Sequence, residues 1–580
     1  MADNPIVQTS YTADPAPMVH DGRLYLYTSH DEDVTVNNFF TMNDWRLYST
    51  VDMVNWTDHG SPAGYKTFSW GTGDAWAIQT IERDGKFYLY APINNSTGSK
   101  IGVAVATSPL GPFTDPLGKA LISTGSGNID PTPYIDSDGQ AFLYWGNPDL
   151  YYVKLNADMI SFPGSTTKVA LTTAGFGVRT KTDRATAYEE GPWFYKRGSL
   201  YYIVYPADST PEKLSYTTSS GPLGPWMYRG DIMAKESGAG SSFTNHPGVV
   251  DYKGHSYLFY HNAALPGGGG YKRSVCVEEF TYGADGSIPM LTMSTGGPKA
   301  VENLNPFVQV EAETIAFSSG LKTEVCSEGG MDVTNINSGD YIKVKNVDFG
   351  SGANSFDARV ASSQSGGNIE LHLDSQTGTL LGTCAVASTG GAQTWTTKTC
   401  TVTGATGLHD LFFKFTGGSG TLFNFNWWKF SGPGAMDMPS GGAGSGGTGS
   451  GGAANNGGAA TAGGAATTGG AATTGGAATT AGAGSGGTGG APVASGGAPA
   501  SVGGSSPSTG GKATVAGSPG MAAGSGNVAG QPGSSTPDSA GCGCHTGPAG
   551  GTTPALATLA LLAVVARRRK TAGSRRAPGN

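Results

Sequence analysis

Residues 185–205 read ATAYEEGPWFYKRGSLYYIVY. The stretch places a carboxylate, Glu189 or Glu190, before a Gly-Pro pair, and a turn at Arg197-Gly198 then leads into a strand of apolar and aromatic residues. A Gly-Pro pair ends a strand sharply and fixes the backbone. An acid held there beside two aromatic residues is partly removed from water, which raises its pKa and keeps its proton available. Taken alone, the stretch also fits a surface glutamate at the start of a strand.

A turn followed by an aromatic strand occurs five times in the N-terminal half of the chain. Asp-Gly or a similar pair between alternating apolar residues is a strong local signal for a β-hairpin. The turn glycines, 54 to 63 residues apart, are Gly22, Gly85, Gly139, Gly198 and Gly254. A repeat of this length indicates propeller blades or another repeat array, and four strands fit into each interval. We therefore predict an all-β fold that begins with a five-bladed β-propeller over residues 1–303.

A second set of residues lies upstream of each turn at nearly the same phase of the repeat. Equivalent positions on successive blades point toward one axis, so these residues are expected to converge on one central mouth. The set, spaced by 56 to 60 residues, comprises Asp14, Asp74 with Trp76, Asp130, Glu190 and His246. Asp-Pro and His-Pro pairs also mark ordinary turns. That explanation suffices for any one position but not for all five in phase.

Three segments of this region resemble the signatures of glycoside hydrolase family 43, an inverting family on a five-bladed propeller. They are ADPAP at 13–17, IDPTPYIDSDGQAFLYWG at 129–146 and EGPWFYKRGSLYY at 190–202. The resemblance covers about the first 300 residues and keeps the family's order.

The resemblance implies roles for individual residues. Asp14 would be the general base, Glu190 the general acid, and Asp130 the carboxylate that orients the acid and adjusts its pKa. Trp76 and Arg273 would line the sugar pocket. His246 matches a histidine near the propeller axis that approaches a central calcium ion or its waters in relatives.

The chemistry is consistent with these roles independently of the family. Inversion needs one protonated acid at the leaving oxygen and one ionised base that activates water on the opposite face, about 6.5–9.5 Å apart. A third carboxylate nearby disfavours ionisation of the acid by like-charge repulsion. Three acids from three blades therefore fit this reaction better than two.

From about residue 306 the pattern changes to short alternating strands separated by turn signals, which is typical of a β-sandwich (jelly-roll). Residues 304–432 resemble carbohydrate-binding module family 6 through EAE at 311–313, QTW at 393–395 and the closing NFNWW at 424–428. Cys384 and Cys400 are the candidate disulfide pair, which would suit an exported protein.

This second resemblance implies two sites in the sandwich. Glu311 and Glu313 would belong to a structural calcium site, in which Asn426 replaces the family's usual Asp and offers only a weaker, neutral oxygen ligand. Tyr341, Trp395 and Asn424 match the family's main sugar cleft, although strand packing also explains Trp395.

The remainder of the chain predicts a linker and a tail. Residues 433–541 are rich in Gly, Ala, Ser and Thr and cannot offset their ordering entropy, so we expect a disordered spacer. Residues 542–580 contain Cys542 and Cys544, a short apolar run and a basic end, and they resemble C-terminal sorting signals of myxobacterial surface proteins. A plain disordered tail is the alternative. The tail therefore predicts attachment to a membrane or cell surface, with either cysteine as the processing or lipid-attachment site.

Composition narrows the class of partner. The 580 residues carry a net charge of −8, and six of the basic residues lie in the last fourteen positions. Phosphate binding needs a basic face, so the balance argues against nucleic acid and is compatible with a neutral sugar polymer.

The first residues lack a basic segment and an apolar segment, so no signal peptide is predicted in this sequence. For an exported enzyme this favours a natural N-terminus upstream of Met1.

The leading hypothesis is a secreted or cell-surface glycosidase acting on hemicellulose. We expect an α-L-arabinofuranosidase on arabinoxylan, acting as a monomer with structural calcium and no organic cofactor, and the alternative is a β-xylosidase of the same fold. A non-catalytic surface polysaccharide-binding protein is the alternative from another class, although retention of all three carboxylates counts against it. A retaining fructan-processing propeller would need a nucleophile in place of the base.

Overall fold

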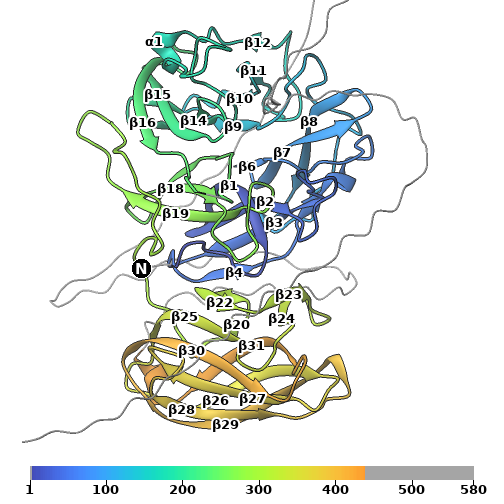
Figure 1. Ribbon diagram of the computed structural model, residues 1–580, viewed down its shortest axis with the longest axis vertical. Helices are drawn as coiled ribbons and strands as arrows, with labels where there is room; N and C mark the ends of the chain where they lie inside the picture. Colours follow the sequence, from blue (N-terminus) through green and yellow to red (C-terminus); the bar gives the residue numbers. More distant parts are fainter. Residues whose placement is uncertain (1–2, 239, 438–580) are drawn as a thin grey trace, which may run out of the picture. The chain divides into compact units, whose positions relative to one another are not determined.

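The computed structural model describes residues 3–238 and 240–437 (Figure 1). Strands dominate this part of the chain, and its one α-helix is the short α1 (Thr173–Phe176), with 3-10 turns η1 (Tyr65–Thr67) and η2 (Pro433–Met436). Within the described residues, no helix has the length and apolarity needed to cross a lipid bilayer. Almost all of the predicted linker, and the whole of the predicted tail, lie outside the described residues.

Five antiparallel sheets follow one another along residues 11–280 of the described chain. The first contains β1 (Tyr11–His20), β2 (Arg23–Asp31), β3 (Asp44–Thr50) and β4 (Trp56–Asp58), with β5 (Ala63–Gly64) and β21 (Thr314–Ile315) at its edges. The second contains β6 (Gln79–Arg83), β7 (Lys86–Asn95) and β8 (Gly98–Ala106). The third contains β9 (Thr132–Ile135), β10 (Ala141–Trp145), β11 (Tyr151–Leu155) and β12 (Thr167–Lys168). The fourth contains β13 (Trp193–Arg197), β14 (Leu200–Ala207), β15 (Lys213–Ser219) and β16 (Met227–Met233). The fifth contains β17 (Gly248–Tyr252), β18 (His255–Asn262) and β19 (Ser274–Phe280).

The five predicted hairpins are confirmed, because the first two strands of every sheet pair around a predicted turn glycine. Two of the turns show why the sequence folds this way. Asp21 and Gly22 have φ of 48° and 74°, and Asp84 and Gly85 have φ of 53° and 72°. A two-residue turn with both φ values positive matches the twist of the strands it joins, and Asp-Gly is a preferred pair for it.

Aromatic side chains pack each sheet against its neighbours. The Phe194 ring of β13 lies 4.6 Å from the Tyr144 ring and 5.2 Å from the Tyr134 ring of the third sheet. On the other side, Trp193 Nε1 donates to the Val249 carbonyl of the fifth sheet at 2.9 Å. The two aromatic residues after the Gly-Pro pair therefore fix β13 to both adjacent sheets.

Two further sheets form the C-terminal β-sandwich. One has the order β23 (Lys322–Val325), β24 (Met331–Thr334), β31 (Asn424–Ser431), β26 (Ala353–Ser362), β29 (Gly391–Ala405), and β20 (Val310–Glu311) pairs with β31. The other has the order β22 (Phe317–Ser319), β25 (Tyr341–Asp348), β30 (Leu408–Gly417), β27 (Gly367–Leu373), β28 (Leu380–Val386). Phe356, Phe413 and Trp428 are buried in the core between the sheets.

The predicted disulfide is confirmed. Cys384 of β28 is bonded to Cys400 of β29, so the bond joins the edge strands of the two sheets. Cys276 and Cys326, for which the sequence offered no partner, are buried free thiols within the described residues.

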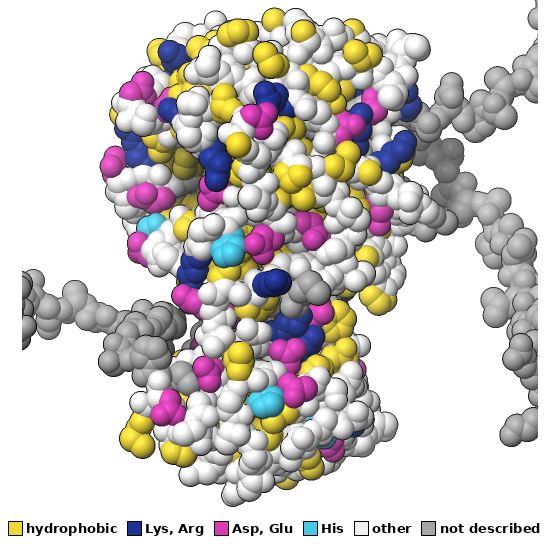
Figure 2. Space-filling model, turned by 90° about the vertical axis from the view of Figure 1, so that its left-hand side faces the viewer, with side chains coloured by type: hydrophobic (Ala, Val, Ile, Leu, Met, Phe, Trp, Pro, Cys, Tyr) yellow, Lys and Arg dark blue, Asp and Glu magenta, His cyan; other side chains and the backbone are white. Residues whose placement is uncertain are grey.

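Charged side chains of both signs are mixed on one face of the molecule (Figure 2). On the face shown in Figure 2, Lys and Arg side chains are interspersed with Asp and Glu side chains. Such mixing gives no extended field of one sign over that face.

Candidate active site

Three of the in-phase acids share an uncommon backbone conformation. Asp14, Asp74 and Asp130 have φ of 50°, 61° and 58°. Residues other than Gly rarely adopt this left-handed region, which Asp tolerates better than most, and such strain is concentrated at functional sites. At Asp14 the register between β1 and β2 shifts between Ala13 and Ala16. The repeat seen in the sequence is therefore a repeat of backbone geometry.

Asp14 is held by a buried guanidinium group. Arg273 Nη1 donates to Asp14 Oδ1 at 3.0 Å. The same guanidinium group donates to both carboxylate oxygens of Asp31, each at 2.9 Å. Arg273 therefore bridges two carboxylates and fixes the position of Asp14.

This arrangement keeps Asp14 ionised. Burial raises the pKa of Asp14, but the Arg273 guanidinium, together with His246, His261 and Ser29, outweighs burial and lowers that pKa to about 2. His261 Nδ1 accepts a hydrogen bond from the Asp14 backbone N–H at 3.2 Å, and burial lowers the pKa of His261 to about 3. His246 Nδ1 lies 4.0 Å from Asp14 Oδ1. A carboxylate that is ionised at neutral pH and held rigidly has the properties of a general base.

The pKa of Glu190 is shifted in the opposite direction from that of Asp14. Burial raises the pKa of Glu190 to about 7, and the neighbouring carboxylates of Glu189 and Asp14 act in the same direction. Asn147 Nδ2 donates to Glu190 Oε2 at 2.5 Å, which partly opposes this rise. A carboxyl group that keeps its proton near neutral pH has the properties of a general acid.

The choice between Glu189 and Glu190 follows from their partners. Glu189 Oε2 accepts from Arg179 Nη1 at 2.5 Å and also from Arg184 Nη2. With two guanidinium groups on one oxygen, Glu189 is engaged in a structural ion-pair network. Glu190, which directly precedes the Gly-Pro pair, is the carboxyl that remains available.

Asp130 connects the acid to the third sheet. Its Oδ2 accepts a hydrogen bond from the Gly191 backbone N–H at 2.9 Å, so it holds the residue next to Glu190. Burial, together with Glu190 and then Asp14, raises the pKa of Asp130 well above its usual range. A Cβ atom on Gly191, whose φ is 52°, would lie 2.9 Å from Pro206 and 3.0 Å from His246. Only glycine allows these groups to approach so closely.

The predicted residues of the sugar-cleaving site therefore come together. The Arg273 charge lowers the pKa of both Asp14 and Glu190, and Asp14 raises that of Asp130. Asp14 and Asp130 keep 5% and 7% of their surface exposed. Trp76 is half-buried against the hydrophobic core that includes Trp45 and Trp193, and its backbone carbonyl accepts from Trp45 Nε1 at 2.7 Å. Within the described residues, its indole N–H donates to none of these acids.

Sequence reasoning missed the residues that hold the acids, although a signal was present. In each repeat a polar residue lies at or near the end of the second strand of the hairpin, seven to ten residues after the turn glycine. In the structure, members of this set contact the in-phase acids directly or through Arg273; they are Asp31, Asn94, Asn147 and His261.

In the sandwich, the predicted sugar cleft is only partly assembled. Asn424 and Trp395 both pair with Ala361, so they lie in one row across three strands. Tyr341 belongs to the other sheet, where its ring stacks with those of Phe317 and Phe412. The structure therefore brings Trp395 and Asn424 near each other and does not add Tyr341 to them.

Two acidic side chains lie beside the row that Trp395 and Asn424 form. Asn424 Nδ2 donates to Asp332 Oδ1 at 2.9 Å and to Glu324 Oε1 at 2.6 Å. Burial raises the pKa of Asp332 to about 7. Trp395 Nε1 donates to Ser327 Oγ at 3.0 Å.

The residues of the predicted sandwich calcium site fit a cation. Glu313 is buried, and its Oε2 has no hydrogen-bond partner within the described residues. Burial and the nearby Glu311 raise the pKa of Glu313 well above its usual range. The Ala312 backbone N–H donates to the Asn426 carbonyl, which ties this segment to the closing strand. An orphaned carboxylate oxygen and repulsion between two acids are what a bound cation would relieve.

The residues around His246 fit a calcium ion poorly. The carboxylate beside His246 belongs to Asp14, which Arg273 already binds, so a cation there would face a guanidinium group. Within the described residues, the group of three possible metal ligands that lie together is a different one: His30, Glu32 and Asp44.

Comparison with known proteins agrees with this geometry. Residues 2–288 match glycosyl hydrolases family 43, and residues 311–432 match carbohydrate binding module family 6. An arabinoxylan arabinofuranohydrolase of Bacillus subtilis (strain 168) is 37% identical over 490 residues of alignment, which covers 74% of this chain and 92% of that protein. The chain belongs to glycosyl hydrolase family 43.

Two further family 43 comparisons cover the same part of the chain. An arabinoxylan arabinofuranohydrolase of Paenibacillus polymyxa is 35% identical, covering 74% of each protein. The crystal structure of a Bacillus subtilis family 43 arabinoxylan arabinofuranohydrolase in complex with cellotetraose has a TM-score of 0.64 at 35% identity, covering 74% of this chain and 97% of that one. The N-terminal domain is thus a glycosidase of propeller fold, and the C-terminal domain is a family 6 carbohydrate-binding module.

Proposed function

We propose that this protein is an inverting α-L-arabinofuranosidase that releases arabinose from arabinoxylan. The observation that carries the proposal is the pair of opposed carboxyl groups in one site, with a pKa of about 2 at Asp14 and about 7 at Glu190. The substrate class is supported by the names of the similar Bacillus and Paenibacillus proteins.

The residues divide the reaction between them. Glu190 gives its proton to the glycosidic oxygen as the bond from that oxygen to the anomeric carbon breaks. Asp14 accepts a proton from a water molecule whose oxygen bonds to that carbon from the opposite face, so the sugar is released with inverted configuration. Asp130 holds the backbone beside Glu190, and Arg273 holds Asp14, so neither group needs to reorganise during the reaction.

A release assay on arabinoxylan tests this proposal. We expect free arabinose, and proton NMR in the first minutes should show the inverted anomer. Xylose in its place would favour β-xylosidase, the second candidate, which is supported by a 31% identical Bacteroides ovatus xylosidase/arabinosidase covering 49% of this chain. The retained anomer would contradict Asp14 as base. Neither sugar, with xylan still bound, would favour the non-catalytic polysaccharide-binding protein.

Three finer features are part of the same proposal. We propose that the five sheets close into a five-bladed propeller; their order along the chain supports this. We also propose a structural calcium ion at Glu311, Glu313 and Asn426, supported by the orphaned Glu313 oxygen. Secretion or anchoring to the cell surface is supported by the sequence of residues 542–580 alone, which lie outside the described residues.

Removal of calcium tests the sandwich site. A chelator should lower the melting temperature of the wild-type chain. Glu313→Gln should melt at the same temperature with and without the chelator, because its calcium site is already lost. An identical effect of the chelator on both proteins would contradict this site.

A further inference from the structure

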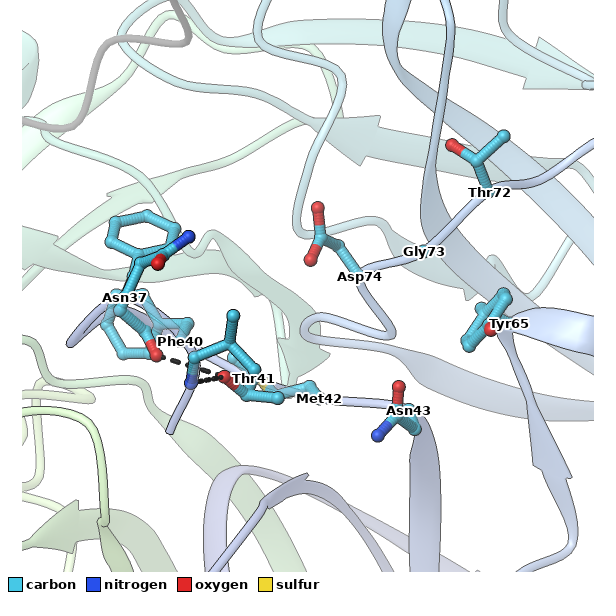
Figure 3. Close-up of a pocket in the computed structure, with 11 residues that line it drawn as sticks. Asn37, Phe40, Thr41, Met42, Asn43, Tyr65, Thr72, Gly73 and Asp74 are labelled. Atoms are coloured by element: carbon cyan, nitrogen blue, oxygen red, sulfur yellow. Dashed lines mark hydrogen bonds between the residues drawn. The ribbon is translucent and has the colours of Figure 1, made fainter. Parts of the chain in front are cut away.

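A pocket of about 430 Å³ opens next to the active site on the first two sheets. Residues 36–43, between β2 and β3, run along one side of it, and residues 72–74, before β6, run along the other (Figure 3). Tyr65 and Asn43 lie at one end (Figure 3). The roles proposed above for Asp14, Asp130 and Glu190 do not use this pocket.

The side chains that line this pocket suit a neutral, polyhydroxylated ligand. Asp74 is the one charged residue among them, and the others are apolar, aromatic, amide or hydroxyl side chains. Phe39 is 43% exposed on the pocket wall, so part of this aromatic side chain is open to contact with the apolar face of a pyranose. Such sites combine apolar walls with a few placed polar groups that fix the orientation of the ligand.

Asp74 is positioned like the catalytic acids. It occupies the same phase of the repeat as Asp14 and Asp130 and shares their left-handed backbone, with a φ of 61°. Asn94 Nδ2 donates to Asp74 Oδ2 at 2.5 Å, as Asn147 does to Glu190. The other oxygen, Oδ1, makes no hydrogen bond to a described residue, so it is available to accept from a ligand hydroxyl.

The pocket shares a wall with the catalytic base. The Phe40 ring lies 4.7 Å from the Arg273 guanidinium carbon, and Met42 Sδ lies 3.7 Å from Arg273 Nη2. Arg273 in turn holds Asp14. A polymer whose arabinose enters the active site continues in both directions from the decorated xylose, so its main chain must cross neighbouring surface.

We propose that this pocket binds an undecorated xylose unit of the arabinoxylan main chain, with Asp74 accepting hydrogen bonds from its hydroxyl groups. The inference rests on the proposed function. Asp74 is then a specificity-determining residue that favours polymer over small arabinosides, because only the polymer reaches the pocket.

The test compares two substrates on the full chain. For Asp74→Asn, the ratio of kcat/KM on arabinoxylan to kcat/KM on 4-nitrophenyl α-L-arabinofuranoside should fall about tenfold, as expected for losing a hydrogen bond to a charged group. Asn also tolerates a left-handed backbone, so the fold should survive. Asp84→Asn is the matched control, since Asp84 also has a positive φ but lies in the exposed turn of the second sheet. Its ratio should equal that of the wild type.

Titration with unbranched xylohexaose gives a readout that does not depend on turnover. The carbohydrate-binding module can take the same ligand, so every chain in this titration also carries Trp395→Ala, in the candidate sugar row of the sandwich. On that background, binding to Asp74→Asn should be about tenfold weaker than to the chain with Asp74 intact, and Asp84→Asn should leave binding unchanged. An unchanged ratio and unchanged affinity would overturn the proposal, as would an equal loss on both substrates. If the wild type fails to cleave either arabinoside, the proposed function fails, and the titration still decides whether Asp74 binds xylan.

Discussion

The surroundings of Asp14 and of Glu190 differ in charge, although the two carboxyls belong to one site. Asp14 has a guanidinium group at 3.0 Å, whereas Glu190 has only a neutral amide at 2.5 Å. Burial disfavours the charged form of both, yet the pKa falls to about 2 at Asp14 and rises to about 7 at Glu190. Because both groups are buried, the charge of their partners, and not a difference in burial, assigns base and acid.

Removal of the base should have the largest effect. Asp14→Asn should lower kcat on arabinoxylan and on 4-nitrophenyl α-L-arabinofuranoside by at least about 10³-fold, because both reactions need an activated water. Asp21→Asn is the matched control, since Asp21 lies in the exposed turn of the same hairpin and has a φ of 48°. A loss confined to one substrate would contradict the base role.

Removal of the acid should lower kcat much more on arabinoxylan than on the aryl arabinoside. Glu190→Gln should lower kcat on arabinoxylan by about 10³-fold, because the sugar oxygen is a poor leaving group that needs a proton. Nitrophenolate leaves without a proton, so the loss on the aryl substrate should be far smaller. Circular dichroism should show an intact fold, and full activity on arabinoxylan would remove Glu190 from the acid role.

Weakening the guanidinium contact should bring the pKa of Asp14 closer to that of Glu190. Arg273→Lys keeps one positive charge but loses the planar, two-oxygen contact. Since Arg273 lowers the pKa of Asp14, that pKa should be higher in Arg273→Lys. The acidic limb of the pH dependence of kcat/KM should therefore move up by about one pH unit. A melting curve checks that the Asp31 contact is not required for folding at the assay temperature. An acidic limb that stays in place would contradict the assignment.

The smallest expected effect concerns the amide on Glu190. Asn147 lowers the pKa of Glu190 by donating to it, so Asn147→Ala should raise that pKa and extend activity to higher pH. A shift of the alkaline limb by about half a pH unit corresponds to a weak net hydrogen bond. A shift toward lower pH would show that Asn147 acts on Glu190 in another way.

The sequence predicts the parts of this site that depend on periodicity. Turn glycines and in-phase acids recur at nearly constant spacing, so the five hairpins and the convergence of Asp14, Asp130 and Glu190 could be predicted. The bridge from Arg273 to Asp31 was missed, because it joins the end of β2 to the residue before β19, and periodicity alone does not show which side chains bond at the strand ends. Alternation also does not reveal which sheet of a sandwich a strand joins. The resemblance to the carbohydrate-binding module groups Tyr341 with Trp395, and the structure places the two in different sheets.

The pH dependence of kcat/KM on 4-nitrophenyl α-L-arabinofuranoside tests the opposed charge states most directly. Activity requires Asp14 ionised and Glu190 protonated, so the wild type should lose activity as pH rises through about 7 and should keep it well below pH 4. In Glu190→Gln the alkaline limb near 7 should disappear. An alkaline limb that persists unchanged in that variant would contradict the account.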